Sequence, residues 1–314
     1  VVEHDTDTMA RADYLVEIGP GAGKEGGTVV AAGTPGRFRR SAALPARFMR
    51  GDERILMPAA RRTGNGKVLR LLGASANNLK NVDFSLPLGK LTVVTGVSGS
   101  GKSSLIRQTL ARALAGALHG AEAMPGPFRD IEGLDAIDKI IEISQEPIGR
   151  TPRSNPATYT KAWTPIRELC AKLPEARTRG YTKSRFSFNV QGGRCEECHG
   201  AGLKTVEMQF LADVQVPCES CAGARFNPET LEVRYRGRTI RDILEMSIAD
   251  AAAFFRNHRK IKRILTTLVE VGMGYVALGQ PSPTLSGREA QRTQRATEPA
   301  RPPTGCTPYV PHQP

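Results

Sequence analysis

Residues 96–103 have the composition and order of a phosphate-binding loop. Glycines at three positions permit the tight turns that point successive backbone N–H groups at phosphate oxygens. Lys102 would place a cation beside the β- and γ-phosphates, and the Ser103 hydroxyl would ligate Mg²⁺. The pattern predicts nucleotide binding, and a glycine-rich turn without a ligand is the alternative. The predicted nucleotide-binding residues are Gly96, Val97, Ser98, Gly99, Ser100, Gly101, Lys102, Ser103 and Ser104.

Four of the six cysteines form two C-x-x-C pairs, Cys195 with Cys198 and Cys218 with Cys221, separated by nineteen residues. Two thiolates on each of two tight turns can complete the tetrahedron that Zn²⁺ prefers. Disulfides and buried free thiols are the alternatives. We find no secretory signal and no apolar run long enough for a membrane span, so we expect a cytosolic, reducing compartment, which favours metal. A fifth cysteine, Cys170, has apolar neighbours at helical spacing and is expected in the core, while Cys306 receives no role.

A third motif, Leu285-Ser286-Gly287-Arg288-Glu289, opens a predicted helix that runs from Ser286 toward Glu298. The motif resembles the signature segment of ABC-type ATPases. There the N-terminus of the helix approaches the γ-phosphate of a nucleotide held by an opposing domain. Few nucleotide-binding domains carry a zinc module between the loop and this signature. The order of the three motifs therefore indicates one family, although each motif alone indicates only a class.

Composition sets wider bounds. The chain has 314 residues, enough for two domains or for one with insertions. Its formal net charge is +13 and its isoelectric point is near 9.8, which suggests a polyanion such as nucleic acid as a partner. The excess is mostly arginine in a chain also rich in alanine, glycine and proline, so GC-rich coding is an alternative source of the charge.

The elements that hold these motifs are predicted from apolar periodicity. Apolar runs predict strands at 12–18, 27–32, 68–72, 82–86, 91–94, 139–144, 206–210 and 214–216. Helical spacing predicts helices from Lys102 through Leu114 and at 239–246, 248–258 and 261–271. Residues 1–5 are interpreted as the end of a buried strand with a polar turn, and 148–156 as a rigid basic loop. The stretch 36–66 contains eight arginines and is interpreted as a flexible linker, with DNA contact as an alternative.

On these motifs the chain resembles the C-terminal part of the UvrABC system protein A family, the damage-sensing component of the bacterial UvrABC excinuclease. The resemblance covers most of the chain apart from 36–66, and includes Ile148–Tyr159, Arg185–Asn189 and Thr284–Glu298. It implies recognition of DNA damage in bacterial nucleotide excision repair by a DNA-dependent ATPase. The implied partners are DNA, a second copy of the protein in a homodimer and UvrABC system protein B, with no membrane and a cytoplasmic location. The implied cofactors are ATP, Mg²⁺ and Zn²⁺.

The same resemblance implies an α/β fold: an incomplete ABC-type P-loop ATPase domain with an inserted zinc-binding module and a helical signature region. Residues 1–35 would be the C-terminal remnant of a first ATPase domain, followed by the Arg-rich linker 36–66. Residues 67–160 would be the N-terminal part of the second ATPase domain. Residues 161–275 would form the inserted region, with the zinc module at 195–221, before the signature helix 276–298 and a degenerate Pro-rich tail 299–314.

Several catalytic positions are assigned only by this resemblance. His4 matches a switch histidine, and Gln145 matches the Q-loop glutamine. Arg288 replaces a family glycine and is expected to obstruct the approach to the γ-phosphate, with an added phosphate contact as the alternative. His312 and Gln313 stand where the family has an Mg²⁺-binding aspartate and a water-orienting glutamate, and neither side chain can do the same chemistry. We therefore expect a truncated chain that binds ATP but hydrolyses it poorly, while an unrelated disordered tail is the alternative.

Four basic residues near the first cysteine pair are candidate DNA contacts: Arg179, Lys183, Arg185 and Arg194. They lie beside Tyr181 and Phe186, which could stack on bases or belong to the core. A basic cluster of this kind predicts DNA binding that is not sequence-specific and that weakens steeply with salt.

Other function classes compete with repair. One is a paralogue that protects the cell from a DNA-binding drug, another a zinc-dependent DNA-binding module without ATPase cycling, and a third the ATPase component of a membrane transporter. The zinc insertion, the Arg185–Asn189 stretch and the basic charge argue against the transporter. The residues do not separate repair from drug protection.

Overall fold

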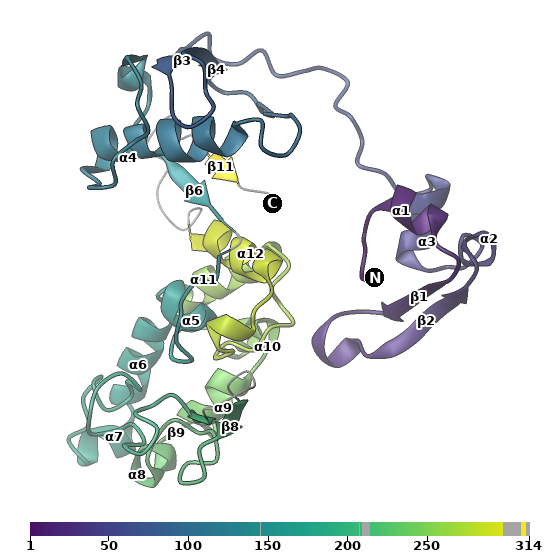
Figure 1. Cartoon of the computed structure of the whole chain (residues 1–314). Coiled ribbons are helices and arrows are strands. Elements are labelled where there is room, and N and C mark those ends of the chain that lie inside the picture. Colours follow the sequence, from purple (N-terminus) through teal and green to yellow (C-terminus); the bar gives the residue numbers. More distant parts are fainter. Residues whose placement is uncertain (145, 207, 209–213, 298–308, 312–314) are drawn as a thin grey trace. The chain divides into compact units, whose positions relative to one another are not determined.

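The computed structural model describes residues 1–144, 146–206, 208, 214–297 and 309–311. The chain divides into two compact units, Val1–Arg61 and Arg62–Pro314 (Figure 1). In the part of the chain that the structure describes, no helix is both long enough and apolar enough to cross a membrane.

The first unit is a β-hairpin with short helices. Strands β1 (Leu15–Gly19) and β2 (Thr28–Gly33) pair antiparallel, close to their predicted positions, with the 3₁₀ turn η1 (Gly23–Glu25) between them. The helices are α1 (Thr6–Arg11), α2 (Pro35–Phe38) and α3 (Leu44–Arg50). A small core of Phe38, Ala43, Ala46 and Met49 joins α2 to α3, and Leu15 of β1 packs against it.

Two segments of the first unit differ from the predictions. The first half of the predicted linker contains α3 and most of α2, because apolar side chains recur there at helical spacing and a proline lies in the first turn of each helix. Val1 and Val2 are exposed and lie in no strand. The chain instead enters α1, whose N-cap is Asp5, and the Asp5 carboxylate accepts a hydrogen bond from the Thr8 N–H at 2.8 Å.

In the second unit, two strands before the phosphate loop and one after it form an antiparallel sheet in the order β4-β3-β5. They are β3 (Val68–Ala74), β4 (Val82–Pro87) and β5 (Asp130–Glu132), so the two strands predicted here are confirmed. After the loop, the π-helical segment η2 (Ser104–Ala111) continues into α4 (Arg112–His119), and the 3₁₀ turn η3 (Leu134–Ala136) follows β5. The helix that follows the phosphate loop packs against β3 in one core, which includes Leu69, Leu71, Leu105, Leu110 and Leu114.

The strand predicted at 91–94 is wrong. These residues form no strand, and Leu91 and Val93 are 86% and 71% exposed. An apolar run becomes a parallel strand only when neighbouring strands satisfy its backbone groups. In the described ranges, the parallel strands β6 (Ile141–Ile143) and β11 (Tyr309–Pro311) pair only with each other, so the run lacks a partner. The strand predicted at 139–144 is confirmed in its centre by β6.

The rest of the second unit is mainly helical. Its helices are α5 (Pro156–Tyr159), α6 (Trp163–Ala171), α7 (Pro174–Thr178), α8 (Pro228–Glu232), α9 (Ile240–Glu245), α10 (Ile248–Phe254), α11 (Arg259–Glu270) and α12 (Gly287–Thr297), with the 3₁₀ turn η4 (Ser282–Thr284) before α12. The helices predicted at 239–246, 248–258, 261–271 and from Ser286 are therefore confirmed. Two antiparallel ribbons complete the unit: β7 (Leu203–Val206) with β8 (Val214–Pro217), and β9 (Arg234–Tyr235) with β10 (Arg238–Thr239).

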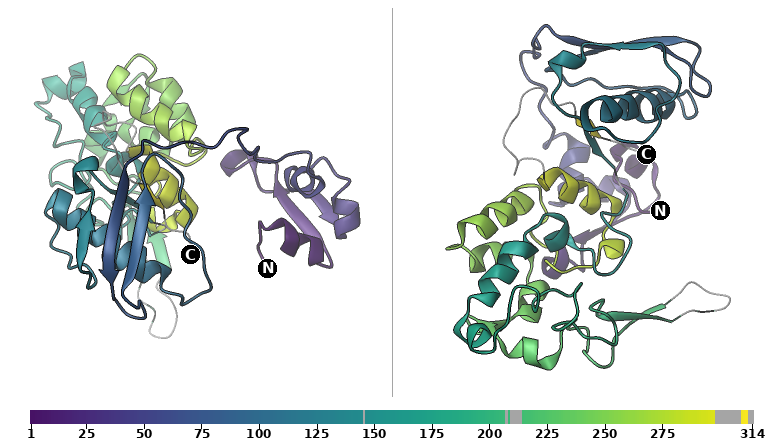
Figure 2. Two further views of the ribbon diagram at one scale, coloured as in Figure 1. Left: turned by 90° about the horizontal axis from the view of Figure 1, so that it is seen from above. Right: turned by 90° about the vertical axis from the view of Figure 1, so that its left-hand side faces the viewer.

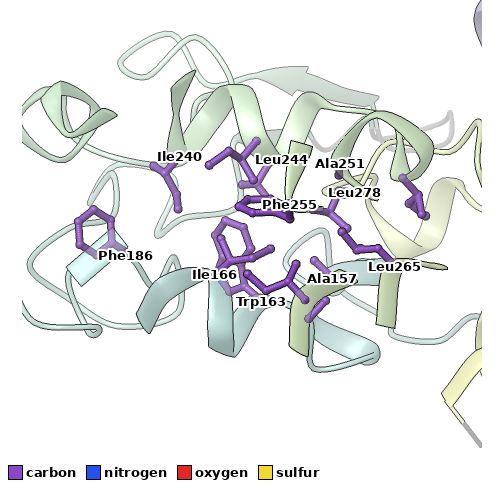
Figure 3. Packing of buried hydrophobic residues seen from close by; sticks show 14 of the residues in the cluster. Ala157, Trp163, Ile166, Phe186, Ile240, Leu244, Ala251, Phe255, Leu265 and Leu278 are labelled. Carbon is purple, nitrogen blue, oxygen red and sulfur yellow. The ribbon is translucent and has the colours of Figure 1, made fainter. Parts of the chain in front are cut away.

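One large core holds these helices together. Trp163 and Ile166 of α6 pack against Leu244, Phe255 and Leu278 from the segments opposite (Figure 3). Cys170 lies in this core, as predicted, and burial raises the pKa of its thiol to about 12. Ribbon β7-β8 projects from the helices, as the right-hand view of Figure 2 shows. Cys198 and Cys218 lie before β7 and after β8, so the ribbon joins the two cysteine pairs.

Candidate nucleotide and metal sites

The phosphate loop lines an open cleft of about 950 Å³. Most of the predicted nucleotide-binding residues line it, together with Asn78, Arg107, Ser144 and Glu146. The Lys102 ammonium donates to the carbonyl of Gly96 at 2.7 Å and to that of Val97 at 2.8 Å, so it lies over the loop. Because its partners are neutral carbonyls of the loop itself, the ammonium can turn to the phosphates of a nucleotide.

Two loop glycines are required by the backbone. Gly99 and Gly101 have φ angles of +79° and +97°, which residues with a side chain rarely adopt. A Cβ on Gly101 would also come within 3.0 Å of the Asn78 side chain. The Leu105 N–H donates to the Gly101 carbonyl at 2.9 Å and begins the helical hydrogen bonding. The N–H groups just before Leu105 therefore lack intrahelical partners and are available for an anion.

Two asparagines after β3 support the loop, and the sequence predictions missed them. The Asn78 amide donates to the Gly99 carbonyl at 2.8 Å. The Asn77 amide donates to Ser104 Oγ at 2.9 Å and to Gln108 Oε1 at 2.7 Å. Asn77 has φ +53°, a conformation that asparagine tolerates better than most residues. The available signal was the pair of asparagines in the connection between the predicted strands 68–72 and 82–86.

The signature motif forms the N-terminus of α12, as predicted. Ser286 and Glu289 cap each other: the Glu289 carboxylate accepts from the Ser286 N–H at 2.8 Å, and the Glu289 N–H donates to Ser286 Oγ at 3.3 Å. The Tyr275 hydroxyl donates to the same carboxylate at 2.5 Å. Burial opposes ionisation of Glu289, but the hydrogen bonds from Tyr275 and Ser286 outweigh it and lower the pKa of Glu289. Arg288 is exposed in this first turn, Gly287 is half-buried, and Leu285 is buried.

Residues just after β6 also line the cleft. The predicted Q-loop residue Gln145 lies outside the described residues, as do His312 and Gln313. The residues on either side of Gln145 in the sequence, Ser144 and Glu146, line the cleft. Arg107 of η2 pairs with Glu142 at 3.4 Å and Glu146 at 3.6 Å, so the helix after the loop contacts the segment around residue 145.

The four predicted metal ligands meet in one cluster. All four sulfur atoms lie within 4.8 Å of one another, and Cys198 Sγ and Cys221 Sγ are 3.7 Å apart. Zn–S bonds of about 2.3 Å in a tetrahedron place sulfur atoms about 3.8 Å apart, so the donor set fits Zn²⁺ with little movement. The cysteines are free thiols. The disulfide alternative is therefore not what the structure contains.

The turns around the cysteines explain this convergence. His199 and Ala222, one residue after Cys198 and Cys221, have φ angles of +50° and +44°. A Cβ on Gly200 would collide with the Phe188 carbonyl, so the first turn requires glycine there. Backbone N–H groups point at the sulfurs, as in the hydrogen bond from Gly202 to Cys198 Sγ at 3.2 Å. Such donors stabilise thiolates, the form that binds metal.

The thiols differ in acidity. Burial alone would raise the pKa of Cys195, but hydrogen bonds from the N–H groups of Cys198 and Glu197 outweigh it and lower that pKa to about 7. Burial raises the pKa of Cys198, and it raises that of Cys221 to about 12. A bound cation would hold all four as thiolates, so metal loading releases protons.

Comparison with known proteins identifies the family. No model of a known protein family matches the chain. Over 315 aligned residues the chain is 55% identical to UvrABC system protein A of Deinococcus radiodurans, covering 100% of this chain and 31% of the relative. The corresponding protein of Bacillus subtilis is 54% identical and that of Thermus thermophilus 55%, each with 100% of this chain and 33% of the relative covered. This chain belongs to the UvrABC system protein A family. It spans about a third of the length of these relatives.

A solved structure supports the same family. UvrA2 from Deinococcus radiodurans matches with a TM-score of 0.93 and 47% identity, covering 99% of this chain and 37% of that structure. The α/β fold of this chain is therefore that of a UvrA protein.

Within this UvrA-family chain, three of the four candidate DNA contacts have acidic partners. Arg179 pairs with Glu232 at 2.5 Å, Arg185 with Glu229 at 3.7 Å, and Arg194 with Glu196 at 3.1 Å. The fourth, Lys183, is exposed and forms no ion pair with any residue that the structure describes.

Arg185 and Arg194 are the most enclosed of these cations. Arg185 Nε donates to Thr230 Oγ1 at 2.8 Å, and its guanidinium lies 4.4 Å from the ring centre of Tyr181. The Arg194 side chain is only 11% exposed. Phe186 is fully buried, and Tyr181 packs against the same core. These two aromatic residues are therefore core residues in this structure. The remaining candidate, His4, is exposed in the first unit.

Proposed function

We propose that this chain is part of a DNA-damage recognition protein of bacterial nucleotide excision repair. The observation that carries the proposal is the order of two sites along the chain. A phosphate-loop cleft and a four-cysteine cluster precede a capped signature helix within a chain 54–55% identical to UvrABC system protein A. Residues 67–160 and 276–298 would supply the loop side and the signature side of one ABC-type ATPase domain, and 161–275 its inserted region.

ATP would bind at residues 96–104. The loop N–H groups would surround the phosphates, Lys102 would turn from the Gly96 and Val97 carbonyls to the β- and γ-phosphates, and Ser103 would ligate Mg²⁺. The Mg²⁺ ion would neutralise phosphate charge. Gln145 would orient water near the γ-phosphate. Hydrolysis would be slow, because His312 and Gln313 occupy the positions of the Mg²⁺-binding and water-orienting carboxylates.

Zinc would bind at the four cysteines and fix the two turns that hold them. Metal analysis of purified, reduced protein should give about one equivalent, since the four sulfurs form one tetrahedral set. Cys218→Ser should lose most of this metal, whereas Cys170→Ser, a buried cysteine outside the cluster, should keep it. Wild-type protein with no zinc would refute this part of the proposal.

DNA would bind around the first cysteine pair, with Lys183 as the leading contact. Arg179, Arg185 and Arg194 could contribute only by exchanging their glutamate partners for phosphate. Breaking these ion pairs would offset part of the free energy gained from the phosphate contacts. A second copy of the protein and UvrABC system protein B of the excinuclease are the proposed protein partners. The five described cysteines are all free thiols, which supports a reducing, cytoplasmic location.

The rate of ATP hydrolysis tests whether this chain is a competent ATPase. The chain should turn over ATP no faster than its Lys102→Ala variant, with or without DNA. Removing a water-orienting or charge-stabilising group typically costs on the order of 10²–10³ in rate. Restoring His312→Asp with Gln313→Glu should raise turnover above the Lys102→Ala background if these two positions are the limiting defect. Fast turnover by the unmodified chain would contradict the assigned roles of His312 and Gln313.

A further inference from the structure

Arg225 is a buried cation whose backbone lies in the left-handed region, which residues other than glycine rarely adopt. It is 7% exposed and has φ +70°. A non-glycine residue persists in this region only where its surroundings hold it there. Among the described residues, Arg225 forms no ion pair with a carboxylate. The position therefore combines an unfavourable backbone conformation with a buried charge that costs free energy unless polar groups surround it.

The Arg225 backbone joins the two cysteine turns. Its N–H donates to the sulfur of Cys221. Its carbonyl accepts from the N–H of Cys195 at 2.9 Å. One residue thus touches a ligand of each pair, so the distance between the pairs sets the backbone position of Arg225.

The Arg225 side chain joins two other segments. Nη1 donates to the Pro152 carbonyl at 3.1 Å, and Nη2 donates to the Gly279 carbonyl at 3.1 Å. The guanidinium carbon lies 5.4 Å from the ring centre of Phe188. The planar guanidinium can donate in two fixed directions at once, which lysine cannot do.

The two segments that Arg225 reaches are themselves hydrogen-bonded to each other. The Ala157 N–H donates to the Leu278 carbonyl at 3.2 Å, and the Ser282 N–H donates to the Ser154 carbonyl at 2.7 Å. Residues 278–282 continue through η4 into the signature helix α12. Arg225 therefore stands between the cysteine cluster and the segment that leads to the signature.

Charge gives Arg225 a second tie to the cluster. Arg225 is hydrogen-bonded through its backbone to Cys195, so its positive charge belongs to a residue beside the cluster. Four thiolates around one divalent cation carry a net charge of −2. A loaded cluster therefore stabilises the nearby guanidinium.

We propose that Arg225 couples metal binding at the four cysteines to the position of the segment Leu278–Ser282, which leads into α12. The coupling rests on the proposed binding of zinc. The metal fixes the two cysteine turns, the turns fix the Arg225 backbone, and the guanidinium fixes the carbonyls of Pro152 and Gly279. Coupling of this kind is reciprocal: metal disfavours opening of the segment by the same factor by which opening of the segment weakens metal binding.

Hydrogen exchange of the full chain tests the coupling, with zinc content measured on the same samples. In wild-type protein, removing zinc with a chelator should speed exchange of the Ser282 and Ala157 amides by about tenfold or more. In zinc-loaded Arg225→Met, exchange at these amides should already be fast and should change little on chelation. Competition with a chromophoric chelator should show zinc bound about 10- to 100-fold more weakly than in wild type, the range typical for residues that support metal ligands.

Arg241→Met is the matched control. Arg241 lies by the same small cavity, beside Arg225 and Gly279, but pairs with Glu245 at 2.7 Å. This variant should behave as wild type. Protection of α11 amides reports whether each variant is folded.

The outcomes separate the coupling from the metal site. Wild-type protein without zinc refutes the proposed metal site. Zinc-loaded, folded Arg225→Met with wild-type exchange at Ser282 and Ala157 refutes the coupling alone. If Arg225→Met does not fold, Arg225→Lys decides the matter. Lysine keeps the cation but cannot span both carbonyls, so faster exchange with zinc bound supports the coupling and unchanged exchange refutes it.

Discussion

The side-chain oxygen of Gln294 in α12 accepts a hydrogen bond from the backbone N–H of Ser144 at 2.9 Å, across 150 positions of sequence. Gln294 Nε2 also donates to the carbonyl of Glu146 at 3.4 Å. Both Ser144 and Glu146 line the cleft that the phosphate loop forms. One side chain therefore ties the signature helix to the segment of the cleft on either side of residue 145.

Gln294→Ala should weaken nucleotide binding without unfolding the protein. Loss of two hydrogen bonds of this kind costs about 1–2 kcal/mol, so the affinity for an ATP analogue should fall by about 5- to 30-fold if the segment must be held for binding. Calorimetric titration measures this change. Arg295→Ala is the control, because Arg295 is the next residue of α12 and is exposed. Equal affinities of the two variants would show that the Gln294 contact does not support the cleft.

The cap of α12 should make stability depend on pH. The hydrogen bonds from Tyr275 and Ser286 lower the pKa of Glu289 below its ordinary 4.5. A depressed carboxylate pKa contributes stability above the unfolded pKa, and this contribution disappears as pH falls through the folded pKa. The difference in stability between wild type and Glu289→Gln should therefore be largest at neutral pH and shrink below about pH 4.5. Urea denaturation over this range measures it, and a constant difference would mean that the charge of Glu289 does not support the cap.

Lys183→Glu should weaken binding to duplex DNA and make it less dependent on salt. Removing one phosphate contact lowers the magnitude of the slope of log K against log salt by about 1, and charge reversal adds repulsion. Fluorescence anisotropy at several salt concentrations measures both effects. Lys172→Glu, at the C-terminal end of α6, is the control for net charge. The assignment of Lys183 is refuted when the two variants weaken binding equally.

The local parts of the two sites could be predicted from sequence. The phosphate loop and the four cysteines depend on residue types at short spacing, and the structure brings each set together as expected. The cap by Glu289 follows from the same kind of local pattern. The role of Arg185 could not be predicted, because it is decided by partners, Thr230 and Glu229, that only the fold brings near.

Contacts between residues far apart in the sequence explain most of the other differences between the predictions and the structure. The run 91–94 has the composition of a parallel strand, but a strand also needs neighbours, and none is present in the described ranges. Asn77 and Asn78 hold the loop by hydrogen bonds to residues more than twenty positions away. Helix α3 was hidden because arginines dominate the composition of 36–66, although Ala46 and Met49 are buried.

The most direct test of the account is titration of a fluorescent ATP analogue, with Mg²⁺, into zinc-loaded wild-type chain and into Lys102→Ala. The loop geometry predicts saturable binding to wild type and an affinity at least about tenfold lower for Lys102→Ala, because the variant loses the cation that contacts the β- and γ-phosphates. Lys80→Ala, an exposed lysine before β4, should bind as wild type. Absence of binding to folded wild-type protein, or equal binding by Lys102→Ala, would contradict nucleotide binding at residues 96–104.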